Sequence, residues 1–199
     1  MNLRERTRAA VKNQITEVAS ALFEDRGYKE TTIDDIAAAI GMSQRSVFRY
    51  FPTKEALVIG KFDRVAERML TELAARPEGE DLWQSLRRMF DVIAAYADGK
   101  EGKGDREPIQ QIVFETPDLL LAYLQRLQHL QEQVLEVIID RARRLGQPYT
   151  NDDPAPRALI AAAFGCLVAA QHAWQARRGV EHLGEMIDQA MLAVRRLGA

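Results

Sequence analysis

Apolar residues recur along most of the chain at intervals of three and four positions, which is the spacing that places side chains on one face of an α-helix. Leu, Ala, Arg, Glu and Gln together outnumber the β-branched residues and glycine that sheets favour. These patterns predict an all-α fold of about nine helices. The expected helices cover approximately residues 7–27, 33–41, 44–51, 54–75, 81–98, 108–114, 117–145, 153–179 and 184–197.

One pair of short helices stands out in the first quarter of the chain. The helical spacing that begins at Ile33 is interrupted at Gly41 and then resumes in a new phase. Thr32, with Asp35 three residues later, has the arrangement of a capping box, which marks the start of a helix. Gly41 accepts the left-handed conformation that ends a helix, and Ser43 is placed to cap the next one. The sequence therefore predicts a helix-turn-helix.

The second helix of this pair has two faces with different chemistry. Its inner face is apolar and consists of Val47, Tyr50 and Phe51. On the outer face, Arg can pair with guanine, Gln with adenine, and an aromatic side chain can touch a thymine methyl group. The outer residues are Gln44, Arg45, Ser46, Phe48 and Arg49. This chemistry is typical of a helix that reads the major groove, although spacing alone also allows a solvated helix in an ordinary bundle.

A longer set of positions around the helix pair carries a family resemblance. These positions are Phe23, Gly27, Tyr28, Thr31, Thr32, Asp35, Ile36, Ala37, Gly41, Ser43, Phe48, Tyr50, Phe51, Lys54, Glu55 and Leu57. With these spacings, residues 8–57 resemble the N-terminal DNA-binding domain of TetR-family transcriptional regulators. The segment from Phe48 to Phe51 departs slightly from the family's commoner pattern, which has a second tyrosine, and this departure leaves the operator sequence open.

The resemblance implies a division of the chain and a set of DNA contacts. Residues 1–53 are expected to form the DNA-binding domain, and residues 54–199 an effector-binding and dimerisation domain that pairs with its copy through the last two helices. In the family, the residue that matches Lys54 touches the phosphate backbone, so Lys54 is expected to position DNA rather than to read it. The residues assigned to DNA binding are Thr32, Ser43, Gln44, Arg45, Ser46, Phe48, Arg49, Tyr50 and Lys54.

Charge is distributed unevenly along the chain. Residues 1–54 carry nine basic and seven acidic side chains, a net charge of +2, whereas the whole chain has a net charge of −2. A positive front on an acidic body suits a DNA-binding domain, although the asymmetry is modest. Arg4, Arg6 and Arg8 are expected to form a loose basic arm before the first helix. Such an arm lies along phosphates, reaches into a minor groove, or is simply a solvated terminus.

The body of the chain is rich in bulky aromatic side chains. Such residues are mostly core, but they can also enclose an apolar cavity, and the resemblance implies that the body binds a small apolar or amphipathic effector. The candidate effector-binding residues are Trp83, Phe90, Tyr96, Phe114, Tyr123, Phe164 and His172. The helix expected at 153–179 is apolar nearly all round, so it must be covered on more than one side. Sequence cannot separate burial in the core from burial between subunits, and the resemblance favours a homodimer.

Other chemistries find little support in the residues. A single cysteine, Cys166, excludes an intrachain disulfide and a cysteine-based zinc site, and we interpret it as a core residue. The three histidines lack metal-ligand spacing, the glycine-rich loop at 99–105 lacks the ending of a phosphate loop, and no catalytic motif stands out. We expect no enzyme activity, no cofactor and no metal. No apolar run reaches the ~18 residues of a membrane span, so a cytoplasmic protein is expected.

The sequence is therefore interpreted as that of a homodimeric regulator that binds double-stranded operator DNA. The favoured mechanism is a repressor released from a palindromic operator by a small apolar or amphipathic effector. The alternatives are an activator, a regulator without a small-molecule ligand, and a helical ligand-binding or scaffolding protein in which the helix pair is only structural.

Overall fold

The structure is a computed structural model that describes residues 3–98, 112–150, 152–177 and 180–197. Three features expected from the sequence lie outside the described residues. They are the glycine-rich loop at 99–105, most of the short helix at 108–114, and the helix stop at Gly179. Residues 112–115, at the end of the expected short helix, are helical.

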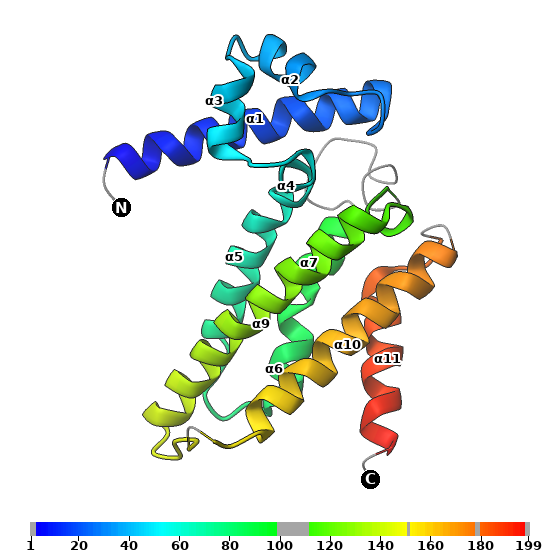
Figure 1. The fold of residues 1–199 in the computed structure, drawn as a ribbon. Helices are drawn as coiled ribbons and strands as arrows, with labels where there is room; N and C mark the ends of the chain where they lie inside the picture. The colour runs from blue at the N-terminus through cyan, green and yellow to red at the C-terminus, as the bar shows by residue number, and fades with distance from the viewer. Residues whose placement is uncertain (1–2, 99–111, 151, 178–179, 198–199) are drawn as a thin grey trace. The chain divides into compact units, whose positions relative to one another are not determined.

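Besides the helical residues 112–115, the described residues form ten helices and no strand (Figure 1), which confirms the all-α prediction. The helices are α1 (Leu3–Arg26), α2 (Ile33–Ala39), α3 (Gln44–Tyr50), α4 (Lys54–Ile59), α5 (Lys61–Ala74), α6 (Leu82–Met89), α7 (Asp91–Ala97), α9 (Pro117–Arg144), α10 (Ala155–Ala176) and α11 (Leu183–Leu197).

Two predicted helices are each divided in the structure. The helix expected at 54–75 breaks at Gly60, where a Cβ atom would lie only 2.8 Å from Cε1 of Phe51, so only glycine lets the Phe51 ring approach the chain this closely. The helix expected at 81–98 breaks at Phe90, which is fully buried. No glycine or proline lies at this second break, so the sequence pattern predicted one continuous helix there.

The start of α1 also differs from the prediction. The helix begins at Leu3 rather than near Thr7, so Arg4, Arg6 and Arg8 lie on its first turns and do not form a loose arm. The expectation of a loose basic arm was therefore wrong. A helix fixes which of these arginines share a face, which a flexible arm would not.

The chain forms two compact units that we describe separately. Unit 1 contains the described residues of 3–63 and 112–124, and unit 2 contains those of 64–98 and 125–197. The chain passes between the units within α5 and within α9. The functional boundary expected at residues 53 and 54 stays a prediction.

Unit 2 is organised around its long helices. The helix α10 packs mainly against α11 and also against α6, while α11 packs against α7 (Figure 1). By length and composition alone α10 could cross a membrane, yet 44% of its most apolar window is buried inside the structure. Because core helices of soluble proteins meet the same criterion, this one helix is a weak indication of a membrane span.

Candidate nucleic-acid interface

The start of α2 is fixed by the predicted capping box. The Thr32 hydroxyl accepts a hydrogen bond from the Asp35 backbone N–H at 3.1 Å, and an Asp35 carboxylate oxygen accepts one from the Thr32 N–H at 2.8 Å. The same carboxylate accepts a hydrogen bond from the Thr32 hydroxyl, and these bonds lower the pKa of Asp35. Thr32 is therefore engaged in holding the helix start.

The turn between α2 and α3 also has the predicted chemistry. Gly41 adopts a φ of +66°, the left-handed conformation that glycine favours. Met42 N–H donates back to the Ala37 carbonyl at 2.9 Å, which closes the end of α2. Ser43 caps α3 by accepting the Ser46 N–H at 3.2 Å, and the two serine hydroxyls lie 2.9 Å apart.

The two faces of α3 separate as the sequence predicts, except at Tyr50. Val47 is fully buried and Phe51, just beyond the helix, is 4% exposed. Tyr50 was assigned to the inner face but is only half-buried, as is Ser46. The exposed residues are Gln44, Arg45, Phe48 and Arg49.

The helix pair is held against α1 by a contact that spacing did not reveal. The hydroxyl of the fully buried Thr31 donates to the Gly27 carbonyl at 2.9 Å and lies 3.2 Å from the Leu22 carbonyl. These bonds tie the segment before α2 to the end of α1. The ring of Phe23 packs beside that of Tyr28, with centroids 5.3 Å apart.

Lys54 begins α4 and is directed toward Tyr28. Its ammonium group donates to the Tyr28 carbonyl and lies 4.1 Å from the centre of the Tyr28 ring. The Tyr28 hydroxyl donates to Glu55 at 2.7 Å, and burial lowers the pKa of Lys54. The half-buried Lys54 is thus positioned by aromatic and carbonyl groups at a helix start that Thr53 caps.

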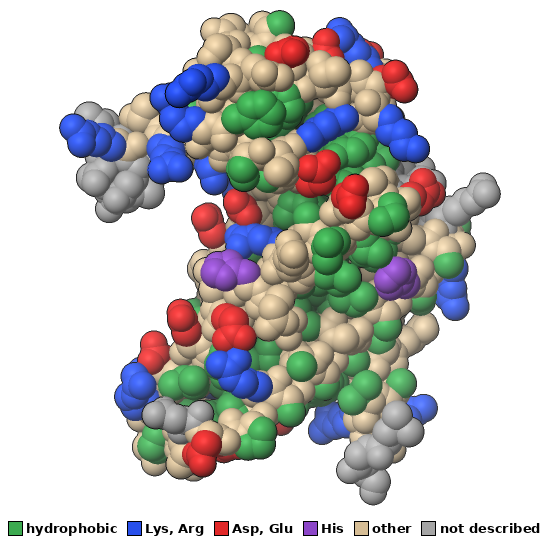
Figure 2. Space-filling view, in the orientation of Figure 1, with side chains coloured by type: hydrophobic (Ala, Val, Ile, Leu, Met, Phe, Trp, Pro, Cys, Tyr) green, Lys and Arg blue, Asp and Glu red, His purple; other side chains and the backbone are tan. Residues whose placement is uncertain are grey.

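A basic hollow lies beside α3. It has a volume of about 430 Å³ and is lined by Arg4, Thr7, Arg8, Arg49 and Tyr50. Figure 2 shows Lys and Arg side chains gathered over α3 and the N-terminal part of α1. Arg4 and Arg8 are four residues apart, a spacing that places two side chains on one face of a helix. The sequence could not predict the hollow because this segment was not expected to be helical.

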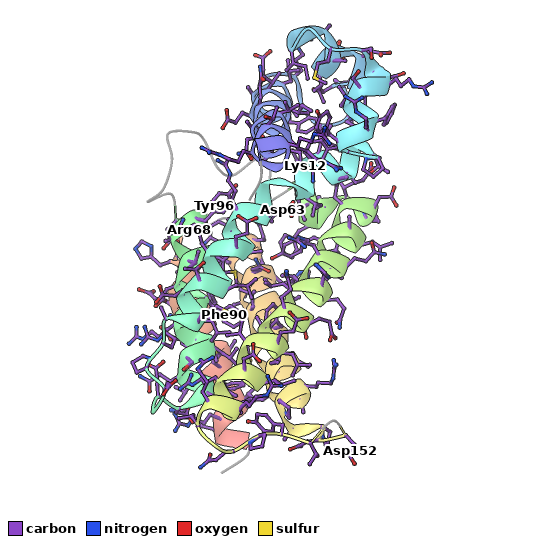
Figure 3. All side chains as sticks on the ribbon, turned by 90° about the vertical axis from the view of Figure 1, so that its left-hand side faces the viewer. Lys12, Asp63, Arg68, Phe90, Tyr96 and Asp152 are labelled. Atoms are coloured by element: carbon purple, nitrogen blue, oxygen red, sulfur yellow. The ribbon has the colours of Figure 1, made fainter. Side chains whose placement is uncertain are left out.

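A further basic residue of α1, Lys12, lies four positions after Arg8 and close to Phe51. Its ammonium group lies 5.3 Å from the centre of the Phe51 ring, and it lies on the side of α1 turned toward α3 (Figure 3). We therefore define the candidate interface as the exposed face of α3, the basic hollow and the start of α4.

The candidate effector-binding residues are divided between the two units. Phe90 and Phe164 are both buried in unit 2, where their rings meet edge to face with centroids 5.3 Å apart, and Figure 3 shows Phe90 among the helices. Phe114 and Tyr123 contact each other in unit 1, with ring centroids 5.9 Å apart. The remaining candidates are the half-buried Trp83 and Tyr96 and the exposed His172.

A buried polar atom in unit 2 was missed by sequence reasoning. The side-chain oxygen Oε1 of Gln133, on α9, is buried and has no hydrogen-bond partner among the described residues. Cys166 is 4% exposed, which confirms its interpretation as a core residue. Unsatisfied buried acceptors are uncommon in folded proteins, so the Gln133 side-chain oxygen is a candidate contact for a water molecule or a bound polar group.

A capped glycine turn, with a second helix that presents amide and guanidinium groups to solvent, defines a helix-turn-helix DNA-binding protein. Residues 15–59 match the family described as "Bacterial regulatory proteins, tetR family", and residues 80–197 match the "MftR C-terminal domain". The chain is also 30% identical to the HTH-type transcriptional regulator TcmR of Streptomyces glaucescens over 203 residues, covering 97% of this chain and 86% of TcmR. The chain therefore belongs to the TetR family of bacterial transcriptional regulators.

Solved structures show the same fold. FadR of Thermus thermophilus, a TetR-family transcriptional repressor in complex with lauroyl-CoA, has a TM-score of 0.60 and 22% identity, covering 90% of this chain and 91% of that one. FadR of Bacillus subtilis, in complex with stearoyl-CoA, has a TM-score of 0.54 and 17% identity, covering 89% and 94%.

The family membership confirms the prediction of a DNA-binding transcriptional regulator. Members of the family are cytoplasmic regulators rather than enzymes; they bind operator DNA and small-molecule effectors and typically dimerise. The individual DNA-binding and effector-binding residues named above stay predictions.

Proposed function

We propose that this protein represses transcription by binding a palindromic operator as a homodimer, with residues 1–53 as the DNA-binding domain and residues 54–199 as the effector-binding and dimerisation domain. The observation that carries the proposal is the exposed face of α3, where Gln44, Arg45 and Arg49 project from a helix anchored by the buried Val47.

The residues of the interface divide into readers and positioning groups. Gln44 and Arg45 carry the amide and guanidinium groups that pair with base edges, and Phe48 offers an apolar contact to a thymine methyl group. The Ser43 hydroxyl caps α3 and lies 2.9 Å from the Ser46 hydroxyl, so Ser43 contributes mainly by holding the reading helix. Thr32 and Lys54 lie at helix starts and Tyr50 carries a hydroxyl group, and both features commonly supply phosphate contacts.

This division is tested by substitution at both classes of residue, using duplexes taken from the region upstream of the protein's own gene. Gln44→Ala or Arg45→Ala should weaken operator binding by ~1–3 kcal/mol and relax specificity. Lys54→Ala should weaken operator and random duplexes alike and lower the salt slope by about one per subunit. If both classes lose affinity equally on every sequence, the reading face lies elsewhere.

The effector part of the proposal rests on unit 2. Phe90 and Phe164 supply buried apolar surface, and the Gln133 side-chain oxygen supplies an unsatisfied acceptor. An amphipathic ligand, with an apolar chain and one or two polar anchors, uses these two kinds of group. Because two proteins with the same fold hold lauroyl-CoA and stearoyl-CoA, fatty acyl-CoAs belong in the first compounds tested.

Effector binding can be followed through Trp83 and Trp174. The Trp174 indole N–H donates to the Glu181 carbonyl at 2.7 Å, so its fluorescence should respond to a change around α10. A true effector should change this fluorescence, raise the melting temperature and release operator DNA, with a coupling of ~1–3 kcal/mol. A charged substitution at Phe164 should weaken all three responses. A ligand that stabilises the protein but leaves DNA affinity unchanged would not be the effector.

The dimer is proposed to form through α10 and α11. Leu192 and Val194 on α11 are exposed apolar residues, 49% and 40% exposed respectively. Exposed apolar side chains are a common feature of subunit interfaces, and because these two residues are two positions apart they project from different sides of α11. Leu192→Glu should shift the mass measured by light scattering from dimer to monomer, whereas the same change at the exposed Leu121 of α9 should leave it unchanged.

A further inference from the structure

The basic hollow of unit 1 brings together side chains from two helices that are distant in sequence. Arg4 and Arg8 are four residues apart on α1, so they project from the same face. Arg49 reaches the hollow from the last turn of α3, and the hydroxyl-bearing residues Thr7 and Tyr50 complete its lining.

Among the described residues, no acidic side chain neutralises the charge of this hollow. None of Arg4, Arg8 and Arg49 forms an ion pair with a described acidic side chain. The Arg49 guanidinium lies 5.5 Å from the centre of the Tyr50 ring, which orients it without cancelling its charge. The positive end of a helix dipole disfavours cations, so two arginines in the first turns of α1 do not serve helix stability.

We propose that the basic hollow binds the sugar-phosphate backbone of the operator, next to the bases that α3 reads, and that Arg4 and Arg8 are DNA-positioning residues. The inference rests on the proposed function of α3. Arg45 and Arg49 are one turn apart on the same side of α3, so DNA that contacts Arg45 continues past Arg49 to the hollow. The guanidinium fork matches phosphate oxygens bidentately.

The size of the hollow supports this assignment. At about 430 Å³ it is larger than a single ion requires and falls within the range of sites that hold small organic groups. A phosphodiester with its sugar fits such a space, and the aromatic ring of Tyr50 offers the sugar an apolar contact. Contacts of this kind fix the register of a protein on DNA without reading sequence.

Arg6 provides a matched control, because it has the same charge and lies exposed on the same turns of α1 but does not line the hollow. Binding of the full-length variants Arg4→Ala, Arg8→Ala and Arg6→Ala should be measured on operator and on random duplex across a salt series. Arg4→Ala and Arg8→Ala should each lower the salt slope by about one per subunit on both duplexes. Arg6→Ala should change it by clearly less. Equal slopes for all three variants would overturn the proposal.

Neutral methylphosphonate linkages can then locate the contact. Placed one at a time along the operator, they should weaken wild-type binding at one or two flanking positions in each half-site. The double variant Arg4→Ala/Arg8→Ala should be insensitive at those positions and still sensitive elsewhere. If the double variant remains as sensitive as the wild type at every position, the hollow does not hold a phosphate.

Three further outcomes separate this inference from its alternatives. If exchanging A·T for G·C pairs in the flanks changes wild-type affinity but not that of the double variant, the arginines read a minor groove, and the phosphate assignment is wrong. If Arg45→Ala relaxes specificity while the Arg4 and Arg8 variants behave like Arg6→Ala, the proposed function of α3 stands and only this inference fails. If wild-type protein binds no duplex, both fail.

Discussion

The two units place their chemistry-bearing side chains in opposite environments. In unit 1 the amide and guanidinium groups of α3 are exposed, and caps within three residues hold the helix that presents them. In unit 2 the aromatic residues Phe90 and Phe164 are buried and meet across more than 70 positions of sequence. A surface on one short helix follows from local spacing, whereas a buried site depends on how distant helices pack.

Substitution of one phenylalanine in each unit should give the largest difference in stability between the two units. Phe90 in unit 2 is fully buried, whereas Phe48 in unit 1 is 41% exposed. Phe90→Ala should lower the free energy of unfolding by about 3–5 kcal/mol because it removes buried contacts and leaves a cavity. Phe48→Ala should lower it by about 1 kcal/mol or less and should instead weaken operator binding. Urea unfolding at a fixed protein concentration and duplex binding measure the two effects.

The opposite pattern would break the comparison. If Phe48→Ala destabilised the protein as much as Phe90→Ala, the exposed face of α3 would be part of a core and not a surface available to DNA.

A buried arginine in unit 2 gives the next largest expected effect. Arg141, on α9, is 9% exposed and donates to the Ser85 hydroxyl and to the carbonyls of Pro77, Glu78 and Glu80 at 2.7–3.0 Å. Arg141→Met should lower the free energy of unfolding by roughly 2–4 kcal/mol, because these acceptors lose their partner.

Arg143, two residues further along, is the control for Arg141, since its ion pair with Asp140 is exposed. Arg143→Met should change stability by roughly 0.5 kcal/mol at most. Equal effects of the two substitutions, measured by thermal unfolding, would mean that the Arg141 hydrogen bonds do not hold the segment between α5 and α6 in solution.

Removal of the Ser43 cap of α3 should have a smaller effect, on both the stability of the protein and its affinity for DNA. Ser43→Ala removes the oxygen that accepts the Ser46 N–H and should cost about 1 kcal/mol of stability. Ser46→Ala leaves that cap in place and should cost less. A loss of operator affinity confined to Ser43→Ala would show that the capped helix positions the reading face, while identical behaviour of both variants would argue against it.

The smallest expected effect is a loss of stability at acidic pH, caused by an ion pair in unit 2. The Arg76 guanidinium holds the Glu80 carboxylate through two hydrogen bonds of 2.6 and 2.8 Å, which lowers the pKa of Glu80 to about 2. The stability that this ion pair contributes is fully present above the ordinary glutamate pKa of ~4.3. It is lost as the pH falls toward 2, where the Glu80 carboxylate becomes protonated. The stability difference between wild type and Glu80→Gln should therefore shrink over that range in urea unfolding. A constant difference would contradict the assignment.

Sequence predicted the local features of unit 1 because they depend on neighbouring residues. The capping box of Thr32 and Asp35, the left-handed Gly41 and the Ser43 cap each involve groups within a few positions. The breaks at Gly60 and Phe90 were missed because they involve tertiary packing, in the first case against Phe51.

The functional residues show the same limit. The outer face of α3 followed from helical spacing, but the hollow required α1 to extend to Leu3 and to lie beside Arg49. Among the effector candidates, Phe90 and Phe164 meet, whereas Phe114 and Tyr123 belong to the other unit. Aromatic residues share the same apolar spacing whether they line a core or a cavity, so the sequence could not divide them.

The central claim, that the exposed face of α3 reads a two-fold symmetric operator, is tested most directly by measuring binding to an operator series in which each base pair is changed in turn. We predict that wild-type protein discriminates in two symmetric half-sites, about one helical turn or roughly 34–36 Å apart, or somewhat more. Arg45→Ala should lose discrimination at the same base pair in each half-site while keeping it elsewhere. A wild-type profile without dyad symmetry, or an Arg45→Ala profile identical to that of the wild type, would contradict the claim.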